Sequence, residues 1–194
     1  MKNPVLLFWL LAWMPVNTCT NNTHLTTIFS YLNACDTAEK SKLMAADFHS
    51  FFISKERSGK NKAETLQSFQ NWDGPMHPDI NIITYSSHDS IWKVTFNEQN
   101  DFTKPIGFPG WKGTTTFVFN KQGLIEETIY TPDSTNISYK PFLQPAINWL
   151  QKNKPGELNE VYQNGKLIQT EMAANKLRAL LQQWKSQKAD LSNR

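Results

Sequence analysis

A run of strand-like segments separated by turns constrains the fold of this chain more than any other feature. Four segments are rich in β-branched and aromatic residues, as strands usually are: 80–85, 91–97, 111–120 and 124–131. The last two are separated only by a tight turn at 121–123, which makes them antiparallel partners. We therefore expect a mostly antiparallel sheet in this part of the chain.

Helical patterns precede these strands. The first has apolar residues at helical spacing, namely Leu25, Ile28, Phe29 and Leu32. A second helix is expected to begin at Asp36, because Glu39 follows three residues later as in a capping box. Its expected buried face consists of Leu43, Met44, Ala46 and Phe48. A short strand at 49–55 and a third helix at 62–72 should follow.

The chain changes character after the strands. Two more amphipathic patterns predict helices at 139–153 and 170–187, and the tail 189–194 is polar. Helices that are kept apart from antiparallel strands define the α+β class. We therefore predict an α+β fold in which residues 134–188 form a C-terminal helical extension.

The N-terminus is typical of an export signal. Residues 1–18 place one lysine before an apolar run that is too short to span a bilayer. Cys19 follows, and it could be acylated as in a bacterial lipoprotein, or it could form a disulfide with Cys35. Residues 19–24 are expected to be a tether. We therefore expect an exported protein, periplasmic, surface-exposed or secreted, whose only membrane contact would be a lipid anchor at Cys19.

Composition excludes several classes of protein. The length of 194 residues fits one domain, and 12 Phe, 7 Trp and 5 Tyr are too many aromatic residues for a disordered chain. A net charge of +3 is too small to indicate a nucleic-acid partner. The sequence has no phosphate-binding glycine loop or nucleophile elbow, and no cofactor is predicted. Four residues could meet around a metal but are more typical of exposed loops, so no metal site is predicted: His77, Asp79, His88 and Asp89.

Three segments resemble one known superfamily. They are YLNACDTAEKSKLMAADF (31–48), SGKNKAETLQSF (58–69) and FVFNKQGLIEETIY (117–130). They are similar to the helix pair, the third helix and the last hairpin of the nuclear transport factor 2-like superfamily, which includes SnoaL-like cyclases and ketosteroid isomerases. The resemblance implies a cystatin-like cone over residues 25–133, in which a curved antiparallel sheet wraps around N-terminal helices and leaves an apolar pocket. The chain would be an exported bacterial member.

The resemblance does not extend to the isomerase carboxylates. The position of the proton-abstracting aspartate falls on Ser54, and that of the oxyanion-binding aspartate falls on Thr115. Isomerisation by this pair is therefore not expected, and fold alone does not give function. Whether the chain is an enzyme is left open.

Candidate pocket residues come from the central loop and from the resemblance. The loop 100–110 and the start of the next strand carry more large apolar groups than a solvated loop needs, including Phe102 and Trp111. Asp101 is the one carboxylate there, and it could act as a base or cap a turn. The resemblance implies that a further set faces the cone: Thr115, Phe117, Thr128, Tyr130 and, from the first helix, Tyr31. His49 is a second candidate base.

These residues favour binding of a small apolar or aromatic molecule in the cone. The molecule would stack on Trp111 and Phe102 and bond to Tyr130 or Asp101. One alternative is an isomerase, cyclase or hydratase-like enzyme that uses Asp101 or His49 as its base. Another is a homodimeric interaction module that pairs through the outer sheet face and has no ligand. The C-terminal helices could cover the pocket mouth or that sheet face.

Overall fold

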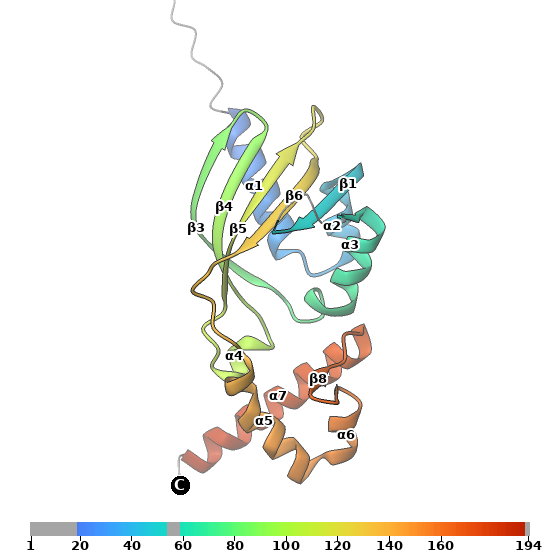
Figure 1. Ribbon diagram of the computed structural model, residues 1–194, viewed down its shortest axis with the longest axis vertical. Helices are drawn as coiled ribbons and strands as arrows, with labels where there is room; N and C mark the ends of the chain where they lie inside the picture. Colours follow the sequence, from blue (N-terminus) through green and yellow to red (C-terminus); the bar gives the residue numbers. More distant parts are fainter. Residues whose placement is uncertain (1–18, 54–58, 193–194) are drawn as a thin grey trace, which may run out of the picture.

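The computed structural model describes residues 19–53 and 59–192, and its largest element is a six-stranded sheet (Figure 1). The strand order is β2-β1-β6-β5-β4-β3. Neighbouring strands are antiparallel except β1 and β6, which are parallel. The strands are β1 (Met44–Phe52), β2 (Lys60–Asn61), β3 (Asp79–His88), β4 (Ile91–Gln99), β5 (Trp111–Phe119) and β6 (Ile125–Pro132). The four predicted strands of the central region are confirmed.

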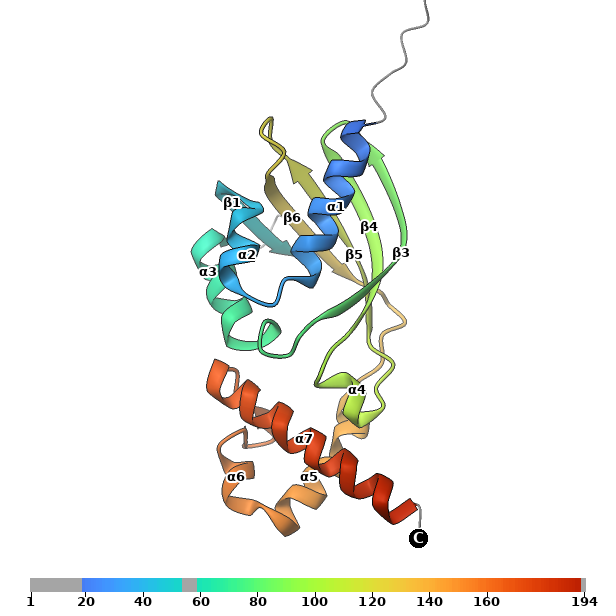
Figure 2. The same cartoon turned by 180° about the vertical axis from the view of Figure 1, so that it is seen from behind.

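Three helices cover the concave face of the sheet (Figures 1 and 2). They are α1 (Cys19–Asn33), α2 (Thr37–Lys42) and α3 (Lys62–Ser68), and α3 continues into a π-helical turn, η1 (Phe69–Asp73). Asp36 caps α2 through a hydrogen bond from the Glu39 backbone N–H at 2.8 Å, as predicted. The chain therefore forms a curved sheet wrapped around N-terminal helices, the α+β cone that was expected.

The second helix is shorter than predicted. It ends at Lys42, and Met44 to Phe52 form strand β1 instead of a helical face. Met44 pairs with Ile125 of β6, and Met44 and Phe48 are almost fully buried against the sheet. Pairing with a distant strand overrides the local helical pattern here, which is a common reason for such errors.

The N-terminal part of the cone differs from two expectations. Residues 19–24 belong to α1, so they are helical instead of forming a tether. Since α1 has 15 residues, its ends lie about 21 Å apart at 1.5 Å per residue. Cys35 follows the far end of this helix and is a free, exposed thiol, so the proposed disulfide with Cys19 is wrong. Residues 1–18 and the Cys19 side chain lie outside the described part, as does Ser54.

Buried side chains fill the narrow part of the cone. Ile28 of α1, Trp92 of β4 and Phe117 of β5 are at most 1% exposed. The Tyr31 ring meets the Phe117 ring edge-on at 5.9 Å. Thr115 and Thr128 are also buried in this region. This end of the cone is a packed core.

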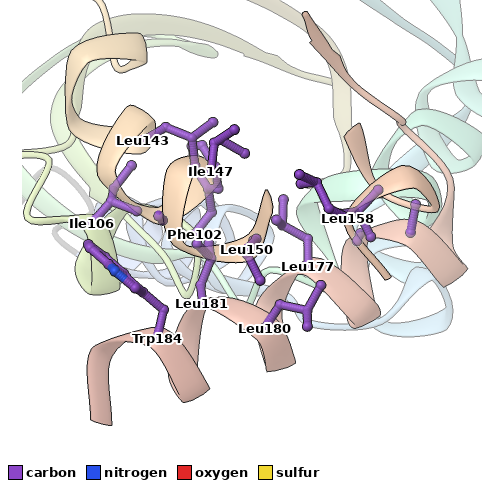
Figure 3. Packing of buried hydrophobic residues seen from close by; sticks show 14 of the residues in the cluster. Phe102, Ile106, Leu143, Ile147, Leu150, Leu158, Leu177, Leu180, Leu181 and Trp184 are labelled. Atoms are coloured by element: carbon purple, nitrogen blue, oxygen red, sulfur yellow. The ribbon is translucent and has the colours of Figure 1, made fainter. Parts of the chain in front are cut away.

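The C-terminal residues form a second, helical unit. It consists of α5 (Lys140–Asn153), α6 (Pro155–Asn159), the hairpin β7 (Tyr162–Gln163) and β8 (Lys166–Leu167), and α7 (Glu171–Ser192). Its apolar core also takes in Phe102, Ile106 and Phe108 from the central loop, which forms the short helix α4 (Thr103–Ile106) (Figure 3). These loop residues are therefore apolar because they join the cone to the C-terminal unit.

The C-terminal unit lies beyond the end of the sheet where β4 ends and β5 begins (Figures 1 and 2). Helix α7 contacts η1 and α4, and α5 contacts α4. The extension thus meets the open end of the cone and leaves the outer sheet face uncovered. No described helix has both the length and the apolar character needed to cross a bilayer.

Candidate functional site

A pocket of about 540 Å³ lies where the cone opens toward the C-terminal unit. We call it the mouth pocket. Its walls come from η1, the central loop, the start of β5, the start of α5 and the β7–β8 turn. Its lining residues are Trp72, Phe102, Trp111, Tyr139, Lys140, Gly165, Lys166, Leu167 and Gln169. The cone and the C-terminal unit therefore build this site together.

Four aromatic rings form the apolar part of the mouth pocket. The planes of Phe102 and Trp111 are nearly parallel, at 5° with ring centres 6.3 Å apart. Tyr139 meets the Phe102 ring at 5.4 Å and Trp72 meets it at 6.0 Å, both edge-on. Phe102 is buried, while Trp72, Trp111 and Tyr139 are half-buried and keep part of their surface in the pocket. Such rings can hold a flat or apolar molecule.

Strand register places a carboxyl beside this aromatic wall. Glu98 of β4 is paired with Trp111 of β5, so both side chains project from the concave face. Burial and the nearby charge of Asp73 raise the pKa of Glu98 to about 7, although a 3.3 Å hydrogen bond from the Asn100 amide opposes this shift. A carboxyl with such a pKa can exchange a proton near neutral pH.

A lysine and a second carboxyl lie close to Glu98. The Lys40 ammonium donates to the Tyr31 carbonyl at 2.6 Å and lies 3.8 Å from the centre of the Tyr31 ring. Its burial lowers its pKa to about 8, despite the opposing charges of Asp73 and Glu98. Asp73 keeps solvent-accessible surface, yet surrounding protein desolvates it and raises its pKa.

Two tyrosine hydroxyls complete this polar cluster. Tyr130 lies across Gly113, where a Cβ on residue 113 would clash with the tyrosine ring. Burial and the charge of Glu98 raise the pKa of Tyr130 to about 12. Burial also raises the pKa of Tyr31, and a hydrogen bond with Thr128 opposes that shift. Both hydroxyls therefore remain protonated donors at neutral pH. We call Tyr31, Lys40, Asp73, Glu98 and Tyr130 the polar cluster.

The structure brings only some of the predicted residues to the mouth pocket. Phe102 and Trp111 line it. The other predicted cone residues do not line the mouth pocket. Tyr130 is half-buried, and the remaining four are buried, namely Tyr31, Thr115, Phe117 and Thr128.

Neither candidate base reaches this site. Asp101 accepts a hydrogen bond from His77 Nδ1 at 2.9 Å, and Arg178 of α7 lies 2.7 Å from Nε2 of the same histidine, so it is His77 that contacts the C-terminal unit. His49 is paired with Glu127 on β6 and lies in a groove of the outer sheet face. No cluster of three or more metal-binding side chains occurs among the described residues.

Sequence reasoning missed most of the polar cluster. Glu98 carried a usable signal, because it continues the alternation of buried Val94 and Phe96 on β4. The expected strand ended one residue too early to include it. Lys40 and Asp73 carried no such signal, since charged residues on short helices are usually solvated.

Replacing Glu98 by glutamine should change how stability depends on pH. Because the pKa of Glu98 is raised from 4.5 to about 7 on folding, this carboxyl is protonated in the folded chain and ionised in the unfolded chain between these pH values. The free energy of unfolding should therefore fall as pH rises through this window. E98Q lacks this titrating group and should not show the fall. The free energy of unfolding of E98Q minus that of wild type should therefore be about 1–3 kcal/mol larger at pH 8 than at pH 5.

Urea unfolding of the two proteins at pH 5 and pH 8 measures this difference. Glu39→Gln, on the exposed surface of α2, is the matched control and should follow wild type. Parallel pH curves for wild type and Glu98→Gln would contradict the assigned burial of Glu98.

No protein-family model and no curated protein sequence matches the chain. Solved structures with a similar arrangement of elements were found. The Δ5-3-ketosteroid isomerase of Mycobacterium sp. is 17% identical with a TM-score of 0.45, over 56% of this chain and 91% of that one. A Mycobacterium tuberculosis protein in complex with estradiol-17β-hemisuccinate is 20% identical with a TM-score of 0.45, over 56% and 92%. A Methylobium petroleophilum protein with a cystatin-like fold is 14% identical with a TM-score of 0.48, over 60% and 80%.

The described strand order and the three helices on the concave face form the cone that the sequence resemblance implied. The chain therefore has an α+β cone with an additional C-terminal helical unit.

Proposed function

We propose that this protein binds a small aromatic or apolar molecule in the mouth pocket. The observation that carries the proposal is a pocket of about 540 Å³ whose walls include the half-buried rings of Trp72, Trp111 and Tyr139. Ligand pockets of about 300–1,000 Å³ that combine aromatic walls with a few polar groups are typical of small-molecule sites. Lys140, Lys166 and Gln169 supply those polar groups.

Native mass spectrometry of the chain purified gently from its host tests this proposal. Comparison with the denatured spectrum should show a mass difference of about a few hundred daltons, the size that such a pocket accommodates. Equal native and denatured masses, together with no stabilisation of the chain by any member of an aromatic ligand set, would contradict it.

An enzyme of the isomerase, cyclase or hydratase type is a second candidate, favoured by the polar cluster. A carboxyl with a pKa of about 7 interacts with the protonated Tyr130 hydroxyl, which is a combination suited to proton transfer and to stabilising a developing oxyanion. In this proposal Glu98 is the base in place of Asp101 and His49. If a bound molecule is found, its conversion should follow the ionisation of Glu98 and be lost in E98Q. Equal turnover in that variant would exclude this role.

Pairing through the outer sheet face is the remaining alternative. A groove on that face is lined by His49, Phe51, Ile91 and Val118 together with acidic residues. Sedimentation that gives a monomer at micromolar concentration would exclude this alternative.

Export and lipid attachment remain proposals that rest on the sequence. Helix α1 begins at Cys19, so a lipid there would place the cone directly at a membrane surface. The denatured mass of the mature chain tests both points, because cleavage before Cys19 and acylation each change it by a defined amount.

A further inference from the structure

Charge is distributed unevenly around the mouth pocket. Lys140 and Lys166 are the charged residues among those that line the pocket, and both belong to the C-terminal unit. The charged side chains of the pocket lining are therefore both basic, and both lie on the side of the C-terminal unit.

Local structure holds both lysines at this edge. Lys140 is the first residue of α5 and directly follows Tyr139, one of the aromatic wall residues. Lys166 begins β8 after a turn in which Asn164 and Gly165 both have positive φ angles, 50° and 75°. This backbone geometry makes the tight type of hairpin turn that fixes the flanking strands.

The two ammonium groups are available to a ligand. Within 19–53 and 59–192, no carboxylate forms an ion pair with either of them, whereas Lys104, Lys154 and Lys176 are each paired. Both side chains are exposed at the pocket edge, so they can turn toward a bound anion. Two lysines at one edge of an aromatic pocket suit a carboxylate that is attached to an apolar ring.

We propose that the ligand is an aromatic carboxylate, with its ring between Trp72, Trp111 and Tyr139 and its carboxylate at Lys140 and Lys166. This inference rests on the proposed binding function and specifies its ligand class. In the opposite orientation the carboxylate would lie against the aromatic wall, where no cation of the pocket lining balances its charge.

Three naphthalene probes separate charge from shape. We would titrate 2-naphthoate, 2-naphthylmethanol and 2-naphthylmethylammonium into the full chain by calorimetry at pH 7.5, in 50 mM and 500 mM salt. The carboxylate is expected to bind about tenfold or more tightly than the alcohol at low salt, and the ammonium is expected to bind most weakly. High salt should reduce the preference for the carboxylate.

Substitution of both lysines tests their role. The double variant Lys140→Gln and Lys166→Gln should lose the preference for the carboxylate and keep the affinity for the alcohol. Lys152→Gln, an exposed site on the same helix α5 that does not line the pocket, should behave as wild type.

The outcomes distinguish this inference from the proposed function. Equal affinities for carboxylate and alcohol, or a preference that survives in the double variant, would overturn the assignment of an anionic ligand while leaving the binding function intact. If no probe binds to the wild-type chain, both proposals fail.

Discussion

Replacing Leu177 by alanine is expected to lower the free energy of unfolding by about 2–5 kcal/mol. Leu177 lies on α7 and has no exposed surface. Figure 3 shows it among Leu150, Leu158 and Leu181 in the core of the C-terminal unit. Truncation removes buried methyl groups and leaves a cavity that a packed helix interface fills only in part.

Urea unfolding followed by circular dichroism measures this loss. Lys185→Ala on the exposed face of α7 is the control and should change the free energy of unfolding by less than about 0.5 kcal/mol. Because Phe102 belongs to the same cluster, the Leu177 variant should also bind aromatic probes more weakly. An unfolding free energy equal to that of wild type would contradict the packing of α7 against the loop and α5.

Replacing Trp111 by alanine is expected to reduce the affinity for an aromatic probe about 30-fold or more, or about 2 kcal/mol. Trp111 stacks on Phe102, contacts Phe108 and Tyr139, and keeps part of its ring at the pocket surface. Its removal takes away one wall of the mouth pocket. Calorimetric titration with 2-naphthylmethanol measures the change without any contribution from the lysines.

Trp149→Ala provides the matched control for this prediction. Trp149 is a half-buried indole of the C-terminal unit that does not line the mouth pocket. Its loss should lower stability and leave probe affinity within about threefold of wild type at a temperature where both variants are folded. Equal losses of affinity in the two variants would indicate a general effect of destabilisation instead of a pocket role for Trp111.

The spacing of apolar residues along the chain predicted most of the helices and strands. The four central strands alternate or concentrate β-branched and aromatic residues, and the two long C-terminal helices keep apolar residues on one face. It failed at residues 44–48, where burial against a partner strand 80 residues away decides the conformation. Such long-range pairing is not encoded in the spacing of neighbouring residues.

The candidate site was only partly accessible to sequence reasoning. Phe102 and Trp111 were identified because a solvated loop has no reason to carry such large apolar groups. Lys40, Asp73 and Glu98 come from three separate elements, and only the folded cone brings them near one another. Tyr139 and Lys140 belong to a unit whose position on the cone no sequence pattern could specify.

The most direct test of the account is to locate a bound probe by nuclear magnetic resonance. The indole N–H signals of the tryptophans can be assigned by single replacements with phenylalanine and followed during titration with 2-naphthoate. We predict saturable shifts of the Trp72 and Trp111 signals and little change for Trp92, which is buried in the narrow part of the cone. Shifts confined to Trp92, or no saturable shift at Trp72 and Trp111, would contradict binding in the mouth pocket.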